Sequence, residues 1–229
     1  GTDAPATFDI NDPEMFGAIE QVLRAVRGSG KVPSRLRSAL MFFIAAAALG
    51  ALLFWGPGAI TRYTASLVPE ATKRDIGTEL LAEMERVTGA PCGEPIGRAA
   101  LETLQARLFP SGDTGLVVVS SAISETAELP GGVILIGNTL VEDFETPEVL
   151  AGFLMAADAR RMRNDPFEDV LEAAGLRASI SLLTTARLPE TALPRMAEWL
   201  AAHTPTPVND AALLSRMEAA SIDSAPYGY

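Results

Sequence analysis

The sequence predicts an α+β protein in which a single transmembrane helix precedes a mostly helical domain with a small sheet. Three observations support this fold class. An apolar stretch without charges lies near the N-terminus, two short β-rich runs lie in the middle, and a helical spacing of apolar residues fills most of the rest. The mean hydropathy of +0.21 together with a net charge of −11 indicates that the apolar residues are concentrated in one place.

The apolar stretch Ser38–Ile60 predicts a membrane span, since no charged residue occurs between Arg37 and Arg62. About 20 apolar residues in a helix cross the hydrocarbon core of a bilayer. A buried core helix of this length rarely lacks a polar face. A cleaved signal peptide has a shorter apolar region that lies nearer the N-terminus.

The charges on the two sides of the span predict its orientation. Positive residues remain on the cytoplasmic side of a membrane. Five cations precede the span without an acid among them, whereas acids dilute the cations that follow it. We therefore expect a cytoplasmic segment 1–37, a span 38–60 and an exported domain 61–229, which lies in the periplasm if the cell is bacterial. Trp55 and Tyr63 fit the outer aromatic belt. The cations before the span are Arg24, Arg27, Lys31, Arg35 and Arg37.

The cytoplasmic segment predicts an amphipathic helix between Asp12 and Gly28, with Pro13 in its first turn. Two interpretations remain open for it. It is either a surface helix on anionic lipid or the last helix of a small cytoplasmic domain, and the second is favoured.

Composition limits the possible partners and cofactors. The acidic balance, without a basic stripe in the exported part, excludes nucleic acid as a partner. The single cysteine, Cys92, permits no intramolecular disulfide and is either a free loop thiol or a bridge to a partner.

Small residues within the span predict a contact with other membrane helices. Ala46 and Gly50 are four residues apart, as are Ala47 and Ala51, and this spacing allows two helices to approach closely in a membrane. The alternative is that alanine is simply abundant in this chain. The favoured partner is a membrane protein complex within the lipid bilayer.

Beyond the span, the sequence predicts helices and two strands. The strands are the runs GLVVVSS (115–121) and GGVILIG (131–137). Helices are expected at 69–89, 97–109, 147–163, 166–185 with a break near Gly175, 191–203 and 210–220.

The stretch ELPGGVILIGNTLVEDFETPEVLAGFLMAADARRMRNDP, ending at Pro166, carries a family resemblance. It is similar to the membrane zinc metallopeptidases of the HtpX-like group (metallopeptidase family forty-eight, which includes the CAAX prenyl proteases). In that family a Leu-Pro-Gly-Gly strand precedes a helix with a His-Glu-x-x-His motif, commonly followed by Arg-Asp-Pro. The resemblance covers Thr72 to Pro166 and implies a metallopeptidase-like fold for the exported domain.

The residues that carry catalysis in the family are replaced here. The first zinc histidine falls on Ala156, the glutamate general base on Ala157 and the second histidine on Arg160. Alanine has no lone pair to donate, and arginine is permanently cationic. Glu198 is only a loose candidate for the third ligand, and His203, the sole histidine, is expected at a helix C-terminus. The sequence therefore predicts a pseudoenzyme with no catalytic residues, no metal site and no cofactor.

Charged residues lie around the end of the helix expected at 147–163, and two interpretations of Arg160 remain open. Arg160 is expected either to pair with Asp165 or Glu168 or to face the emptied cleft. The wider set of acids and arginines is expected to form a solvated, mixed-charge helix face. These residues are Asp158, Asp165, Glu168, Asp169, Arg160, Arg161 and Arg163.

Two functions are compatible with a fold that has lost its site. The first is an accessory, scaffold or assembly subunit of a larger membrane protein complex. The alternative is a periplasmic module that binds peptides or regulates a protease through an edge strand at Leu129, Pro130, Gly131 and Gly132.

Overall fold

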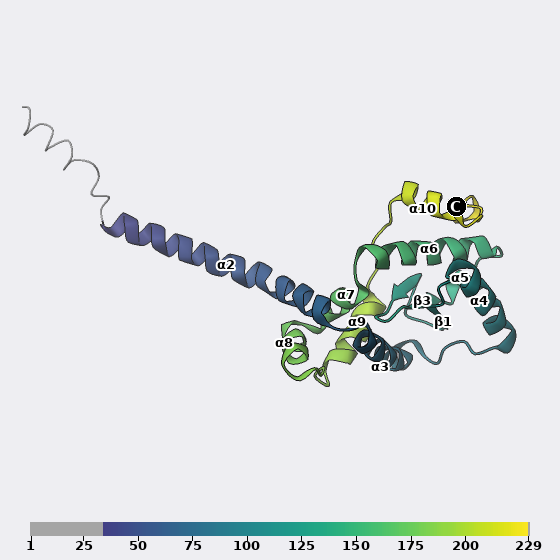
Figure 1. Cartoon of the computed structure of the whole chain (residues 1–229), viewed down its shortest axis with the longest axis horizontal. Helices are drawn as coiled ribbons and strands as arrows, with labels where there is room; N and C mark the ends of the chain where they lie inside the picture. Colours follow the sequence, from purple (N-terminus) through teal and green to yellow (C-terminus); the bar gives the residue numbers. More distant parts are fainter. Residues whose placement is uncertain (1–33, 229) are drawn as a thin grey trace, which may run out of the picture. The chain divides into compact units, whose positions relative to one another are not determined.

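The computed structural model describes residues 34–228, in two units that divide between Phe54 and Trp55. The predicted helix between Asp12 and Gly28 lies outside the described residues. The first described element is helix α2 (Ser34–Leu67), which continues beyond the predicted span at both ends (Figure 1). In the described part of the chain it is the one helix that is long and apolar enough to cross a membrane. Its apolar side chains from Leu40 to Ile44 are exposed.

The second unit is mostly helical and contains a three-stranded sheet, which confirms the α+β fold class (Figure 1). The predicted helix boundaries agree with the observed ones within a few residues, and the break at Gly175 separates two helices as expected. The helices are α3 (Glu70–Thr88), α4 (Pro95–Leu108), α5 (Thr139–Glu142), α6 (Pro147–Arg163), α7 (Pro166–Ala174), α8 (Leu176–Thr185), α9 (Ala192–Ala202) and α10 (Asp210–Ala219), followed by a 3₁₀ turn η1 (Pro226–Gly228).

The sheet contains one strand more than the sequence predicted. Strand β3 (Val133–Gly137) lies in the centre and pairs in parallel with β1 (Gly115–Val119). On its other side it pairs antiparallel with β2 (Thr126–Glu128), in the stretch that was predicted to be a connection. Three residues, Thr-Ala-Glu, are too few to show an alternating pattern, so β2 could not be predicted from its own residues.

The prediction that Leu129–Gly132 forms an edge strand is wrong. These residues form the turn between β2 and β3, and Gly131 and Gly132 both adopt positive φ angles. A β-carbon on Gly131 would lie 2.6 Å from the Cα of Arg74, and one on Gly77 of α3 would overlap the carbonyl oxygen of Pro130. The turn is therefore packed against α3, and the two edge strands of the sheet are β1 and β2.

Helices cover both faces of the sheet, and their apolar stripes form the core. On one face, α3, α7 and α9 pack together around a cluster that includes Leu80, Met84, Phe167, Leu171 and Met196. On the other face, α6 lies across β3, so that Leu154 and Ala157 meet Ile134 and Ile136. The alternation of side chains along β3 explains how one strand serves both clusters.

The C-terminal end of α2 belongs to the second unit. The Oγ1 atom of Thr61 lies 3.2 Å from the Oγ atom of Ser179 on α8, and Arg62 Nε donates to Glu168 Oε1 of α7 at 3.0 Å. Thr64 and Ala65 are also buried there. The last turns of α2 are therefore part of the folded domain.

Candidate functional site

Helix α6 carries the positions at which the sequence predicted lost catalytic groups. Pro147 begins the helix, since a missing backbone N–H costs nothing in the first turn. The helix ends at Arg163, and Asp165 then caps α7 by accepting a hydrogen bond from the backbone N–H of Phe167. The Asp165–Pro166 pair is thus an N-cap followed by a first-turn proline, which ends one helix and begins the next.

Ala156 and Ala157 lie in packed apolar surroundings. Ala157 is fully buried in the cluster between α6 and β3. Ala156 is 3% exposed and belongs to a separate cluster with Leu213 and Met217 of α10. Methyl groups fill both places, so neither position leaves room for a larger side chain without movement of its neighbours.

Arg160 faces the sheet and forms an ion pair with β2. Its Nε and Nη2 atoms donate to the same oxygen, Oε1 of Glu128, at 2.9 and 2.7 Å, and Nη2 also donates to Thr126 Oγ1 at 2.7 Å. Both charged side chains are 16% exposed. The expected pairing of Arg160 with Asp165 or Glu168 is therefore wrong, because its partner is Glu128.

Burial has a larger effect on the pKa of Glu128 than the neighbouring charge of Arg160 has. Loss of hydration disfavours the charged carboxylate and raises the pKa of Glu128 above its usual value of 4.5, although the charge and hydrogen bonds of Arg160 act in the opposite direction. Arg160 therefore offsets only part of the free-energy cost of burying the charged carboxylate of Glu128.

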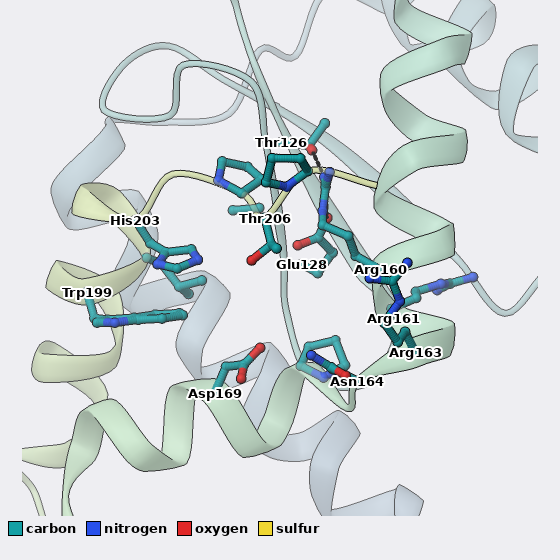
Figure 2. A pocket seen from close by; sticks show the side chains of 15 residues that line it. Thr126, Glu128, Arg160, Arg161, Arg163, Asn164, Asp169, Trp199, His203 and Thr206 are labelled. Atoms are coloured by element: carbon teal, nitrogen blue, oxygen red, sulfur yellow. Dashed lines mark hydrogen bonds and ion pairs between the residues drawn. The ribbon is translucent and has the colours of Figure 1, made fainter. Parts of the chain in front are cut away.

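A small cavity of about 70 Å³ opens beside this ion pair (Figure 2). Figure 2 shows Glu128 and Arg160 on one side of the cavity, and Trp199 and His203 of the α9 segment on the other. The imidazole of His203 stacks on the indole of Trp199, with ring centroids 4.2 Å apart and planes inclined by 22°.

The predicted third-ligand candidate does not lie in the cavity. Glu198 is exposed and is absent from the cavity wall, whereas His203 lines the wall at the C-terminal end of α9. Among residues 34–228 no group of three or more histidine, cysteine or acidic side chains is placed to hold a metal ion. The structure thus brings His203 and Arg160 to one cavity but leaves Glu198 outside it.

The prediction of a solvated, mixed-charge face at the end of α6 is wrong for Asp158 and Arg160, whereas Arg163 and Asp169 are exposed. Asp158 is 5% exposed and accepts hydrogen bonds from Arg161 and from Arg216 of α10. Lys73 of α3 pairs with Asp165. Arg216 and Lys73 lie on other elements far along the chain, so the local charge pattern could not predict these contacts. The charges join α6 and α7 to the rest of the domain.

Tyr227 covers one side of α6, a contact that was not predicted from the sequence. Tyr227 of η1 packs its ring against Gly152, where a β-carbon would overlap the ring. The same ring meets Phe153 edge-on, with centroids 5.1 Å apart. Gly152, the one glycine of α6, was the local signal of this close approach.

The small residues Ala46, Ala47, Gly50 and Ala51 lie on α2 and are exposed. A β-carbon on Gly50 would meet no atom within 4 Å. Cys92 is exposed as well, and its backbone N–H donates to the carbonyl of Val118 at the edge of β1.

Comparisons of the chain with models of known protein families and with curated proteins find no match.

Proposed function

We propose that this chain is a membrane-anchored, catalytically inactive relative of the HtpX-like zinc metallopeptidases, which acts as an accessory, scaffold or assembly subunit of a larger membrane protein complex. One observation carries the proposal. Arg160, at the position of the second zinc histidine, is bonded to Glu128 and Thr126 on β2. A residue that would repel a zinc ion instead stabilises the domain.

The two neighbouring replacements support the same proposal. Ala156 and Ala157 are both buried, each in a different apolar cluster. In α6, all three positions that the resemblance matches to catalytic residues contribute to packing or to an internal ion pair. We therefore infer that the helix is retained for its fold. Catalytic function is then not the reason for which this helix persists.

The proposed location is a bacterial inner membrane, crossed once by α2, with the N-terminus in the cytoplasm and the second unit in the periplasm. The basic residues before Ser38 support this orientation. The apolar, exposed side chains of α2 support an environment of lipid rather than water.

The proposed contact with the membrane complex uses the face of α2 that is formed by the small residues Ala46, Ala47, Gly50 and Ala51. Close packing of membrane helices depends on small side chains at such positions. Ala45 lies on the opposite side of the same helix and provides a matched control.

Isolation of the complex tests this function. The full chain, purified from native membranes in mild detergent, should retain a membrane protein in stoichiometric amount. The double substitution Ala46→Leu and Gly50→Leu should release that partner, whereas Ala45→Leu should keep it. Equal retention by both variants would remove α2 from the contact, and a full chain without any stoichiometric membrane partner would contradict the accessory function.

Metal analysis tests the inactivity. The purified full chain should contain far less than one zinc ion per molecule. One zinc per chain that is lost on His203→Ala or Glu198→Ala would show a working metal site and overturn the proposal.

The cavity beside β2 favours a second candidate, a periplasmic module that binds peptides or regulates a protease. The wall of this cavity includes the edge strand Thr126–Glu128. Because its volume is only about 70 Å³, a peptide would pair along the edge of β2 rather than fill the cavity. Co-purification of a broad set of periplasmic peptides, in place of one membrane protein, would favour this candidate.

A further inference from the structure

An apolar stripe remains exposed on α8. Leu176, Ile180 and Leu183 follow one another at helical spacing and are 36%, 48% and 43% exposed. The opposite side of α8 is buried against the domain through Ala178 and Leu182. This short helix therefore has two apolar sides, and the fold of the domain covers one of them.

The position of α8 relative to the chain's apolar stretch indicates what covers the other side. Ser179 of α8 contacts Thr61, the residue that directly follows the uncharged stretch ending at Ile60. If Ser38–Ile60 fills the hydrocarbon core, Thr61 lies at its boundary. Contact with Thr61 then places α8 at the level of the lipid head groups.

Neighbouring side chains fit this boundary. Trp55 and Tyr63 on α2 are 79% and 63% exposed, and these two residue types are enriched at membrane interfaces. Trp55 lies five residues before Ile60, the end of the apolar stretch, and Tyr63 lies three residues after it. Their exposure next to the domain supports an interface at the same height as Thr61.

The charge of this segment is opposite to that of the chain as a whole. Residues 176–188 include Arg177 and Arg187, both exposed, and no acidic residue, although the chain carries a net charge of −11. Arginines beside an apolar helix face are typical of helices that lie on anionic lipid. A surface for a protein partner would have no comparable reason to lack acids in so acidic a chain.

We infer that α8 is an interfacial helix, which inserts Leu176, Ile180 and Leu183 into the outer leaflet beside α2 while Arg177 and Arg187 bind phospholipid phosphates. This inference rests on the proposed membrane span. The domain is then fixed on the bilayer by two elements, α2 and α8, and cannot rotate freely about its anchor. A fixed orientation would present the same faces of the domain to every neighbour in the membrane.

Nitroxide labels on the full chain in nanodiscs of phosphatidylcholine and phosphatidylglycerol test the inference. In a Cys92→Ser background, one label is placed at Ile180→Cys, a second at Thr185→Cys on the opposite side of α8, and a third at Leu49→Cys in the span. Accessibility to oxygen reports lipid, and accessibility to a water-soluble nickel chelate reports water. The oxygen-to-nickel ratio should be several-fold higher at residue 180 than at residue 185, and it should fall at residue 180 when phosphatidylglycerol is omitted.

The three labels separate the possible failures. A lipid-like ratio at residue 49 with a water-like ratio at residue 180 would overturn the inference and leave the span intact. A label at residue 180 that is shielded from both reagents would mean that protein covers the stripe, which also overturns it. A water-like ratio at residue 49 would overturn the membrane span and this inference together.

Discussion

Arg160 and Glu128 lie 32 residues apart, and two nitrogens of the guanidinium donate to a single oxygen of the carboxylate. This ion pair joins the polar end of α6 to the short edge strand β2. It also occupies the place where the sequence resemblance expects a metal ligand. The same side chain therefore explains both why this position is unsuited to zinc and how β2 is held in the sheet.

The ion pair should contribute measurably to stability. Arg160→Ala leaves a mostly buried carboxylate without its partner, so we expect a loss of about 2–3 kcal/mol in the free energy of unfolding. Urea unfolding of the full chain in detergent, with the variants Arg160→Ala, Glu128→Ala and the double variant, should give a coupling of roughly 0.5–3 kcal/mol. The pair Arg86–Glu83, whose arginine side chain is 74% exposed, is the control and should couple by less than about 0.5 kcal/mol. Equal coupling in both pairs would contradict a special role for Arg160.

The stability of the chain should depend on pH through Glu128. Its pKa in the folded chain lies above the usual 4.5, so the folded state holds this proton more tightly than the unfolded state. The associated stabilisation is complete below pH 4.5 and is lost as the pH rises through the raised pKa. The free energy of unfolding of the wild type, minus that of Glu128→Gln, should therefore fall with rising pH.

Removal of the arginine provides a check on that pH dependence. Arg160 lowers the pKa of Glu128, so in Arg160→Ala the same loss of stability should move to higher pH. The comparison is between Arg160→Ala and the double variant Arg160→Ala with Glu128→Gln, by urea unfolding at several pH values. A difference that does not change with pH would show that Glu128 has the same pKa in the folded and unfolded chain.

The turn between β2 and β3 should tolerate no side chain at its contact with α3. Gly77→Ala would push a methyl group into the carbonyl of Pro130, and we expect a loss of roughly 1–3 kcal/mol. Gly131→Ala adds the strain of a positive φ to its overlap with Arg74. Gly97→Ala on α4 is the control, because a β-carbon there meets nothing within 4 Å and should stabilise the helix by up to about 1 kcal/mol. Thermal unfolding of the three variants distinguishes them, and a neutral Gly77→Ala would disprove the close packing.

Local signals explain which elements the sequence revealed. Helix α6 begins with a proline and ends two residues before Asp165, the N-cap of α7, and the prediction of α6 matched the structure. Strand β2 is three residues long and depends on pairing with β3, a contact that leaves no periodic trace in its own residues. Sequence alone therefore located the framework of the domain but misplaced its edge strand.

The candidate site, too, could be predicted from the sequence only in part. That Ala156, Ala157 and Arg160 are unsuited to bind zinc could be predicted from the residue types alone, since this depends only on what each side chain can bind. The partner of Arg160 was not readable, because Glu128 comes from a different element and is chosen by tertiary packing. The contact of Tyr227 with Gly152 has the same cause, a segment that returns from the end of the chain.

Membrane topology can be tested with a reporter. An enzyme that is active only in the periplasm, fused after Tyr229, should be active in a bacterial host, because the basic residues precede the span. Replacing Arg35 and Arg37 by glutamate should reduce this activity by weakening the positive flank. A silent but fully expressed fusion of the unchanged chain would reverse the proposed orientation.

Restoration of the metallopeptidase motif should damage the fold before it creates an enzyme. Ala156→His would enter the cluster with Leu213 and Met217, and Ala157→Glu would place a carboxylate among Ile134, Ile136 and Leu154. Overpacking costs roughly 1–3 kcal/mol at each position, and burial of an unpaired acid adds to the second. Arg160→His also releases Glu128. We expect Ala157→Glu to be the most destabilising single change and the triple variant to unfold at a markedly lower temperature.

The triple variant should also fail to cleave peptides, because Glu198, the loose candidate for the third ligand, lies outside the cavity wall. Zinc content and chelator-sensitive proteolysis are measured on the full chain, alongside the single variant Arg160→His as a control that keeps both buried alanines. One zinc per chain with chelator-sensitive cleavage would mean that α6 and α9 still form a metallopeptidase cleft. In that case the buried alanines would be recent replacements in a nearly intact enzyme, and the role of this helix would have to be sought in catalysis rather than in packing.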